Sequence, residues 1–286
     1  MDFKNAGVLP WAEELYEAYV FDMDGTLYLG DHLLPGAKRM MEELRRLDLP
    51  VRFLSNNPTK NPRQYLEKLE DLGIHAELDE IASTVVTTVR WLKRNHPDAV
   101  VFPIAEAPLV DALKEAGFTV SDDPEKIDIV IASYDRTFDY RKLQIAFDAI
   151  WFHKRAFLIA TNPDRFCPFP GGRGEPDCAS IIAAVEACTN TKCQEVIGKP
   201  NPIMLREALG DLDVDLRKVV MVGDRLSTDI EMAVNAQMAS AMTLTGESTW
   251  EEVLELQPEH RPTMVLDRVD KLIPKEIWEQ NDWAEN

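Results

Sequence analysis

Short apolar runs of strand length alternate with amphipathic helical segments along most of this 286-residue chain. Residues 19–23 and 51–54 are mostly apolar, and polar residues follow each run, as expected for buried strands that leave a sheet. Between them, the segment after Pro35 places apolar residues at helical spacing until Pro50 ends it. This alternation predicts a parallel sheet with helices on both of its faces.

The same alternation continues through the rest of the chain. A helix is expected from Pro62 to a C-terminal cap at Gly73, and further helices at 107–116, 140–153 and about 179–188. The later runs that read as strands are 100–104, 127–132, 156–160, 195–198, 218–222 and 239–244. Two α/β units, one inserted in the other, account for this length better than a single sheet does.

The composition indicates a soluble globular protein, with 45% hydrophobic and 28% charged residues. No apolar run is long enough to cross a bilayer, and residues 1–20 lack the pattern of a secretory signal, so we expect a cytoplasmic location. The net charge of −19 disfavours nucleic acid and anionic membranes as partners. A protein with this charge that binds an anionic ligand must gather positive charge locally, through a metal ion and a few basic groups.

The four cysteines, all in one third of the chain, contain no C-x-x-C pair. Their irregular spacing gives weak support to a zinc site, and reduced thiols in a reducing compartment are the simpler interpretation. They are Cys167, Cys178, Cys188 and Cys193, and the sequence assigns no role to the first two.

The first predicted strand ends in an acidic pair, Asp22 and Asp24. Ligands of open α/β sheets bind at the carboxyl ends of strands, where one carboxylate can attack phosphorus while the other acts as acid and base. Read alone, D-x-D is more simply an acidic turn. An EF-hand fits poorly, because Leu27 and Leu33 stand where its loop needs Gly and Glu.

A polar triplet, Ser55, Asn56 and Asn57, follows the second strand. Its hydroxyl and two amides would suit phosphate oxygens if they emerge beside Asp22. Taken alone, Ser-Asn-Asn-Pro is only a turn with helix-capping residues.

A lysine, Lys199, follows the strand at 195–198. A Walker A loop is excluded, because Cys193 and Pro200 stand where it needs Gly and Ser or Thr. A lone lysine is usually a solvated surface charge. A lysine just beyond a strand, between Gly198 and Pro200, is better placed to point into a site.

A second acidic pair follows the strand at 218–222. Asp224 leaves the strand and has the better claim to a metal, whereas Asp229 lies at or near a helix start and also suits a cap. Each of the four segments is weak evidence singly. Their order, and their common position at strand carboxyl ends, favours one site.

Together the four segments resemble the motifs of the haloacid dehalogenase superfamily over essentially the whole chain. The resemblance is carried by Asp22-Met23-Asp24-Gly25-Thr26, Ser55, Lys199, and Gly223-Asp224 with Asp229. The stretches around Asn56, Lys199 and Asp224 are similar to a narrower group, subfamily IIA. That group includes p-nitrophenyl-phosphatase-like, pyridoxal-phosphate and phosphoglycolate or glycerol-phosphate phosphatases.

The resemblance implies an α/β fold with a Rossmann-like parallel-sheet core and an inserted α/β cap domain. Too little chain lies between Thr26 and the helix after Pro35 to form a cap, whereas ample chain separates Ser55 from Lys199. We therefore expect core domain at 1–97 and 192–286 and cap domain at 98–191. Caps of this kind often pair, so a homodimer through the cap is a further expectation.

The resemblance also implies residue roles and a reaction. Asp22 would be the nucleophile that forms an aspartyl-phosphate, and Asp24 the acid and base. Lys199 would neutralise the charge of the phosphoryl group. The residues expected to bind that group by hydrogen bonds are Ser55, Asn56 and Asn57.

A Mg²⁺ ion is the cofactor that the resemblance implies. The Asp22 carboxylate, the Asp24 carbonyl and Asp224 would hold it, with Asp229 behind them. Converging carboxylates repel one another, and a divalent cation removes that conflict and keeps Asp22 ionised.

Substrate choice is expected to depend on the loop 162–178, whose Gly171-Gly172-Arg173-Gly174 stretch can present Arg173 or backbone N–H groups. A flexible surface loop with a solvated arginine is an equal alternative. Pro176-Asp177-Cys178 stands where the family tends to have glycines, which favours a sugar or polyol phosphate over a flat aromatic one.

The expected function is Mg²⁺-dependent hydrolysis of small phosphate monoesters, p-nitrophenyl phosphate included. A phosphomutase or phosphotransferase of the same superfamily shares the chemistry, but its cap mostly follows the first motif. A catalytically silent binding protein is the non-enzymatic alternative, against which the intact motif residues argue. A receiver domain is far shorter and lacks D-x-D-G-T.

Overall fold

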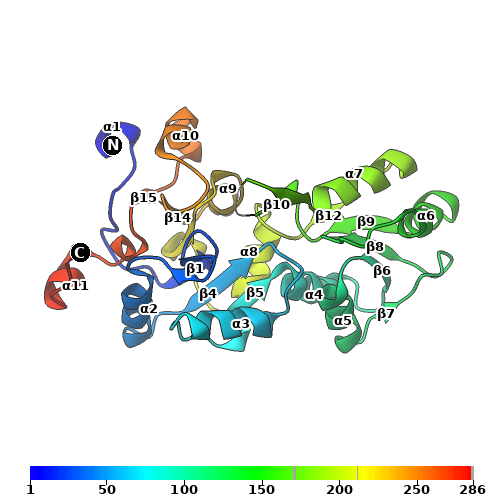
Figure 1. Cartoon of the computed structure of the whole chain (residues 1–286), viewed down its shortest axis with the longest axis horizontal. Coiled ribbons are helices and arrows are strands. Elements are labelled where there is room, and N and C mark those ends of the chain that lie inside the picture. The colour runs from blue at the N-terminus through cyan, green and yellow to red at the C-terminus, as the bar shows by residue number, and fades with distance from the viewer. Residues whose placement is uncertain (170–171, 211, 285–286) are drawn as a thin grey trace. The chain divides into compact units, whose positions relative to one another are not determined.

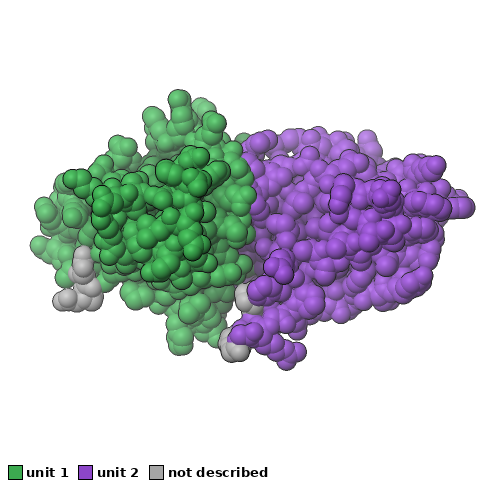
Figure 2. All heavy atoms as spheres, turned by 90° about the horizontal axis from the view of Figure 1, so that it is seen from above, with its two compact units in different colours: residues 1–54, 65–81, 208–286 green, residues 55–64, 82–207 purple. Residues whose placement is uncertain are grey.

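The computed structural model describes residues 1–169, 172–210 and 212–284. Gly171, part of the stretch expected to present Arg173, lies outside the described residues. The chain forms two compact units, coloured separately in Figure 2. Unit 1 contains residues 1–54, 65–81 and 208–286, and unit 2 contains 55–64 and 82–207. The domain boundaries expected from the sequence stay a prediction.

A six-stranded sheet of order β15-β14-β13-β1-β4-β5 forms the centre of unit 1 (Figure 1). The four pairings from β15 to β4 are parallel. Its strands are β1 (Ala18–Asp22), β4 (Val51–Ser55), β5 (Ile81–Ser83), β13 (Val219–Gly223), β14 (Ala239–Thr243) and β15 (Met264–Leu266).

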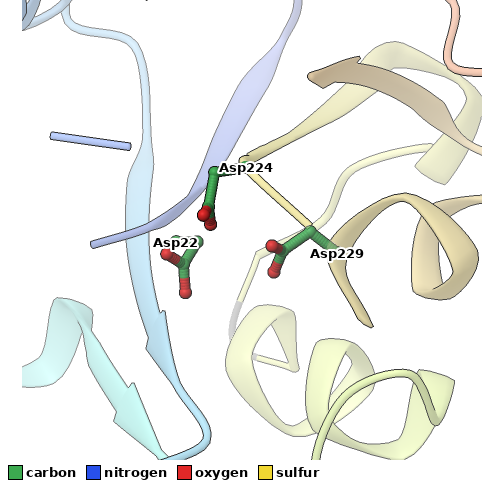
Figure 3. A group of neighbouring side chains, drawn as sticks. All are labelled: Asp22, Asp224 and Asp229. Carbon is green, nitrogen blue, oxygen red and sulfur yellow. The ribbon is translucent and has the colours of Figure 1, made fainter. Parts of the chain in front are cut away.

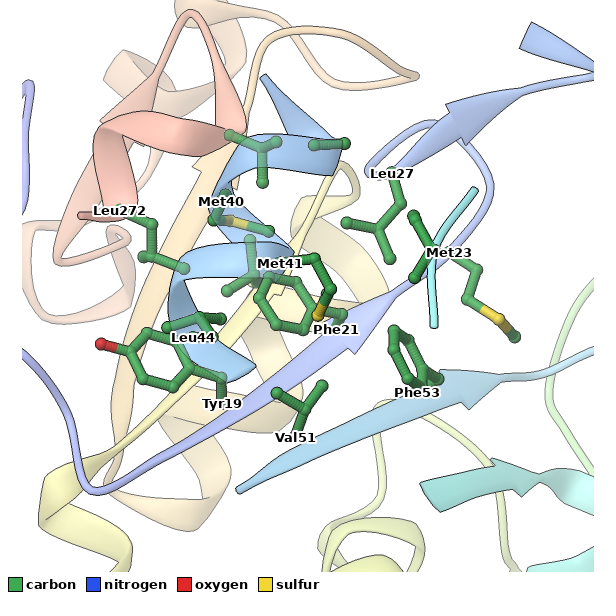
Figure 4. Packing of buried hydrophobic residues seen from close by; sticks show 14 of the residues in the cluster. Tyr19, Phe21, Met23, Leu27, Met40, Met41, Leu44, Val51, Phe53 and Leu272 are labelled. Atoms are coloured by element: carbon green, nitrogen blue, oxygen red, sulfur yellow. The ribbon is translucent and has the colours of Figure 1, made fainter. Parts of the chain in front are cut away.

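Strand β1 lies between β13 and β4, and its first four residues are buried. Helix α2 (Ala37–Arg46) packs Met40, Met41 and Leu44 against the ring of Phe21 and its neighbours, as Figure 4 shows. These side chains are almost completely buried. The position of Asp22, at the end of β1, is therefore fixed by one of the most tightly packed parts of the core.

The other helices that lie in or begin next to unit 1 are short, apart from α3. They are α1 (Phe3–Ala6), α3 (Pro62–Asp71), α8 (Pro202–Leu209), α9 (Glu231–Ala236), α10 (Trp250–Glu255) and α11 (Lys275–Gln280). A small antiparallel hairpin, β2 (Tyr28–Leu29) with β3 (His32–Leu33), follows the first motif.

Unit 2 has a second parallel sheet, of order β12-β9-β8-β6-β7. Its strands are β6 (Val100–Ile104), β7 (Thr119–Val120), β8 (Ile129–Ala132), β9 (Phe157–Ala160) and β12 (Glu195–Val196). Apolar side chains pack on both faces. Val130 and Leu158 belong to one cluster and Ile129 and Ile159 to the other, because successive strand residues point to opposite faces.

Helices cover the two faces of the unit 2 sheet. α4 (Thr84–Asn95) and α5 (Ala107–Glu115) lie on one side, and α6 (Tyr140–Phe147) and α7 (Cys178–Thr189) on the other (Figure 1). A hairpin of β10 (Phe166–Pro168) and β11 (Gly174–Pro176) precedes α7, in the segment expected to be a loop. No helix in the described part of the chain is both long and apolar enough for a membrane span.

The predicted fold class, α/β with parallel sheets, is confirmed. The expected helix at 140–153 is α6 followed by a π-helical turn at Asp148–Phe152. Strands β5, β7 and β15 and the two hairpins were not predicted. Each of them has only two or three residues, too few to show a periodic pattern.

Candidate active site

The first motif leaves the sheet through a tight turn. Asp22 is the last residue of β1 and is half-buried, whereas Asp24 is exposed. Gly25 has φ +86° and donates its N–H to the Tyr28 carbonyl at 2.7 Å, which closes the turn. A residue other than glycine would be strained in this left-handed conformation.

Three carboxylates converge at the carboxyl ends of β1 and β13. Asp22, Asp224 and Asp229 each place an oxygen within 4.8 Å of the others, and Figure 3 shows their side chains facing one another. Asp224 directly follows β13, and Asp229 lies in the π-helical turn Leu226–Ile230. Asp229 is completely buried and Asp224 is 4% exposed.

A loop after β14 holds Asp224 in place. The Glu247 N–H donates to its carboxylate at 2.8 Å, and the Ser248 N–H to its carbonyl at 3.1 Å. Gly246 allows this approach, because a Cβ there would lie 2.5 Å from the Asp224 Cβ and Cγ. A Cβ on Gly25 would likewise lie 2.6 Å from Asp224 Oδ2. Two glycines therefore shape the space around this carboxylate.

Asp229 is held from its own turn and from β13. Its carboxylate accepts the Arg225 N–H at 3.2 Å, and a Cβ on Gly223 would overlap its side chain. Ile230, and not Asp229, directly precedes α9. The capping role expected for Asp229 is therefore its hydrogen bond from the Arg225 N–H, which lies within the π-helical turn.

A basic side chain accompanies the acidic cluster. Arg225 forms an ion pair with Glu247 at 2.7 Å. Burial acts to lower the pKa of Arg225, but four surrounding carboxylates outweigh it, Glu247 most strongly, so that pKa lies above its ordinary value. The arginine therefore stays charged and offsets part of the negative potential.

The cluster fits a divalent cation. Two unit charges 4.8 Å apart repel by roughly 3.5 kcal/mol at an effective dielectric constant of about 20, and the cluster contains three such pairs. Oxygen donors of this kind are the ligands that Mg²⁺ prefers. The expected ligand set of Asp22, Asp24 through its carbonyl, and Asp224 stays a prediction. The structure places the Asp229 carboxylate beside Asp22 and Asp224 as well.

The second motif forms a hydrogen-bonded turn in unit 2. The Asn57 N–H donates to Ser55 Oγ at 3.2 Å, and Asn57 Oδ1 accepts from the backbone and hydroxyl of Thr59 at 2.8 and 2.7 Å. The local turn that the sequence allowed as an alternative is therefore present. Phosphate binding by these residues stays a prediction.

The third motif is joined to the second by the side chain of Asn56. Its Oδ1 accepts the Lys199 N–H at 2.8 Å, and its Nδ2 donates to the Lys199 carbonyl at 3.0 Å. Lys199 is buried, with 3% exposed, and precedes a cis peptide bond to Pro200. The lysine is therefore not a solvated surface charge.

Arg173 lies in the hairpin β10–β11, where its side chain is exposed and its carbonyl accepts the Phe169 N–H at 2.7 Å. The following Asp177 is the buried N-cap of α7. Burial raises the pKa of Asp177 to about 6, although hydrogen bonds from Cys178 and Asn162 act in the opposite direction.

Comparison with known proteins identifies the family. A model of haloacid dehalogenase-like hydrolases matches residues 19–119, and a HAD-hydrolase-like model matches residues 196–272. An acid sugar phosphatase of Staphylococcus epidermidis is 35% identical over 239 residues, which cover 83% of this chain and 90% of that protein. The chain belongs to the haloacid dehalogenase family.

Solved structures of this haloacid dehalogenase family match the fold over most of the chain. A 4-nitrophenylphosphatase from Thermotoga maritima has a TM-score of 0.82 and 31% identity, and covers 90% of this chain and 95% of its own. A p-nitrophenyl phosphatase from Archaeoglobus fulgidus has a TM-score of 0.82 and 28% identity, with 90% and 98% covered.

The family and the narrower p-nitrophenyl-phosphatase-like group that the sequence indicated are thus confirmed. The predicted enzyme class, a hydrolase of phosphoric monoesters, is confirmed at the level of this family. Three site residues escaped the sequence analysis: Gly246 and Glu247, which hold Asp224, and Asp164, which contacts Asn56. No local signal in the sequence marks these contacts, because each partner lies more than twenty residues away along the chain.

Proposed function

We propose that this chain is a Mg²⁺-dependent phosphatase of small phosphate monoesters, with sugar or polyol phosphates as its natural substrates. The observation that carries the proposal is the convergence of Asp22, Asp224 and Asp229 at the ends of two adjacent parallel strands. The named relatives, an acid sugar phosphatase among them, support both the chemistry and the substrate class.

In the first half of the proposed reaction, a carboxylate oxygen of Asp22 attacks phosphorus and the bond from phosphorus to the ester oxygen breaks. Asp24, exposed two residues further on, gives its proton to the departing oxygen. The product alcohol leaves, and the phosphoryl group stays on Asp22.

In the second half, Asp24 takes a proton from water while the water oxygen bonds to phosphorus. The bond from phosphorus to Asp22 then breaks, which releases inorganic phosphate and restores the carboxylate. Asp24 thus ends with the proton it began with, and the cycle is balanced.

The remaining motif residues bind and orient. Asp22, Asp224 and the Asp24 carbonyl would hold Mg²⁺, with Asp229 behind them, and the charge of the ion would let a phosphate dianion approach an anionic nucleophile. Ser55, Asn57 and Lys199 would bind the phosphoryl oxygens, and so would Asn56 through its backbone N–H, because its side-chain amide bonds to Lys199 and Asp164. The part of unit 2 at 98–191 would be the cap, with Arg173 near the substrate.

The test is the variant Asp22→Asn with p-nitrophenyl phosphate and with a panel of sugar, polyol and aromatic phosphates. Loss of the nucleophile should lower kcat by at least about 10³-fold. Asp31→Asn is the matched control, because its side chain is 98% exposed. Phosphate release is measured with Mg²⁺ and with EDTA, and circular dichroism checks the fold.

Each alternative has its own outcome in this assay. A wild-type protein that releases no phosphate from any ester is a silent binding protein. Movement of the phosphoryl group within the substrate, without free phosphate, indicates a mutase. Preference for aromatic esters over sugar and polyol phosphates would contradict the proposed substrate class. A cytoplasmic location and a homodimer through the cap stay predictions.

A further inference from the structure

Both ends of the Asn56 side-chain amide form hydrogen bonds within unit 2. Besides its two bonds to the Lys199 backbone, Nδ2 donates to Asp164 Oδ2 at 3.0 Å. The backbone carbonyl of Asn56 also accepts a hydrogen bond from the hydroxyl of Thr84 at 3.0 Å. Asn56 therefore links the second and third motifs to Asp164, a residue that belongs to neither motif.

Asp164 is itself held firmly. Asn162, completely buried, donates Nδ2 to the same Asp164 oxygen at 2.8 Å and lies 3.2 Å from Asp177 Oδ1. The Asp164 carbonyl accepts the Ala179 N–H at 3.0 Å, in the first turn of α7. Asp164 is thus held through its carboxylate by Asn162, two residues after β9, and through its carbonyl by α7.

Close backbone packing places these segments together. A Cβ on Gly198 would lie 2.6 Å from the Thr161 carbonyl oxygen and 2.7 Å from Asn56 Oδ1. The Gly198 N–H donates to that Thr161 carbonyl at 2.8 Å. The backbone at Lys199 is therefore held on two sides, by the Thr161 carbonyl and by the Asn56 side chain.

The chemistry of a carboxylate gives Asp164 a definite effect on Asn56. An ionised carboxylate only accepts hydrogen bonds, so it attracts the NH₂ end of the amide and repels the carbonyl end. With Nδ2 directed at Asp164, Oδ1 is left to accept the Lys199 N–H. In the flipped amide, Oδ1 would face Asp164 Oδ2 and the Lys199 carbonyl, which are both acceptors.

We propose that Asp164 is a positioning residue, which acts through the Asn56 amide to fix the backbone of Lys199. The effect of Asp164 on activity rests on the proposed function, in which Lys199 binds the phosphoryl group. It makes the segment after β9 part of the machinery that prepares the phosphate site, without any contact between Asp164 and substrate.

The first experiment measures kcat and KM with p-nitrophenyl phosphate for Asp164→Ala, Asn56→Ala and the double variant. We expect Asp164→Ala to lower kcat/KM by about 10–100-fold, as loss of an orienting partner does elsewhere. Because Asp164 acts through Asn56, the double variant should be no worse than Asn56→Ala alone. Independent, multiplying losses would overturn the proposal.

Two further variants complete the test, one as a control and one as a conservative substitution. Asp122→Ala, also in unit 2, removes an exposed acid paired with Arg141 and should keep wild-type activity. Asp164→Asn keeps an acceptor oxygen but loses the charge, so we expect a loss smaller than that of Asp164→Ala. This conservative variant carries the test if Asp164→Ala does not fold, and wild-type kcat/KM for it would then overturn the proposal.

A second measurement is independent of catalysis. Hydrogen–deuterium exchange at the Lys199 amide should be faster in Asp164→Ala than in Asp122→Ala, because the bond to Asn56 Oδ1 is weakened. Unchanged exchange would overturn the inference even if activity falls. An inactive wild-type protein whose exchange responds as expected would instead refute the proposed function and leave the Asp164 contact established.

Discussion

The substitution Gly246→Ala tests whether Asp224 must occupy its present position. The added Cβ would lie 2.5 Å from both Cβ and Cγ of Asp224, whereas ordinary contact begins at 3.4 Å. Relief requires a shift of about 0.9 Å, and because Asp224 Cβ is bonded to the main chain, the backbone must move with the carboxylate. The loop cannot retreat without losing the bonds that Glu247 and Ser248 make to Asp224.

The size of this shift determines the expected effect. Mg²⁺ tolerates deviations of only about 0.2 Å from its ligand distances of about 2.0–2.1 Å. A shift of about 0.9 Å should therefore remove Asp224 from any metal shell that it shares with Asp22. Loss of one supporting contact typically weakens metal binding 10–100-fold, or roughly 1.4–2.7 kcal/mol, and we expect a weakening in that range or beyond it.

The assay is phosphate release as a function of Mg²⁺ concentration at saturating p-nitrophenyl phosphate. The half-maximal Mg²⁺ concentration should rise at least tenfold in Gly246→Ala. Gly30→Ala is the control, because its added Cβ meets nothing within 4 Å although its φ is +57°. Thermal unfolding in EDTA shows whether both variants fold. A Gly246→Ala enzyme with the wild-type Mg²⁺ dependence would refute the reasoning.

Two further predictions concern stability and reactivity. Because burial raises the pKa of Asp177 from 3.8 to about 6, its protonated form stabilises the fold below pH 4, and this contribution of roughly 3 kcal/mol is lost as the pH rises through 6. The free energy of unfolding of Asp177→Asn should lack this pH-dependent contribution. Urea unfolding of the wild type and of this variant at pH 4 and pH 7 checks the prediction, and an identical pH dependence of the two would contradict it. Among the thiols, Cys188 is exposed and Cys178 completely buried, and burial raises the pKa of both. A disulfide reagent should therefore label Cys188 in the native protein and Cys178 only after unfolding. Cys188→Ser is the control, and rapid labelling of Cys178 in the native protein would contradict the prediction.

The sequence predicted the parts of the fold that long apolar runs specify. Strands such as β1 and β13 are buried on both faces, so their composition identifies them, and the polar residues that follow, Asp22 and Asp224, are found at their ends. Short edge elements gave no such signal. β7 has two residues and gains its strand character only from pairing with β6.

The candidate site was predictable where polar residues follow a predicted strand within a few positions. Asp164 and Gly246 act through contacts with Asn56 and Asp224, which lie far from them along the chain. No local pattern encodes such contacts, because they arise from the order of strands in the sheets. The place of Asp229 behind the metal stays a prediction, and its carboxylate lies within 4.8 Å of the other two.

The strand order also has a consequence for synthesis on the ribosome. β1 pairs with β13, whose residues lie about 200 positions later in the chain. Closing so long a loop costs roughly 5 kcal/mol in chain entropy. Strands β6 to β12 all lie within 82–207 and can pair earlier, which shortens that loop before β13 emerges. The acidic cluster is thus assembled late, after 82–207 can already have folded. A variant that slows folding of 82–207 should therefore delay the appearance of activity without changing the final enzyme.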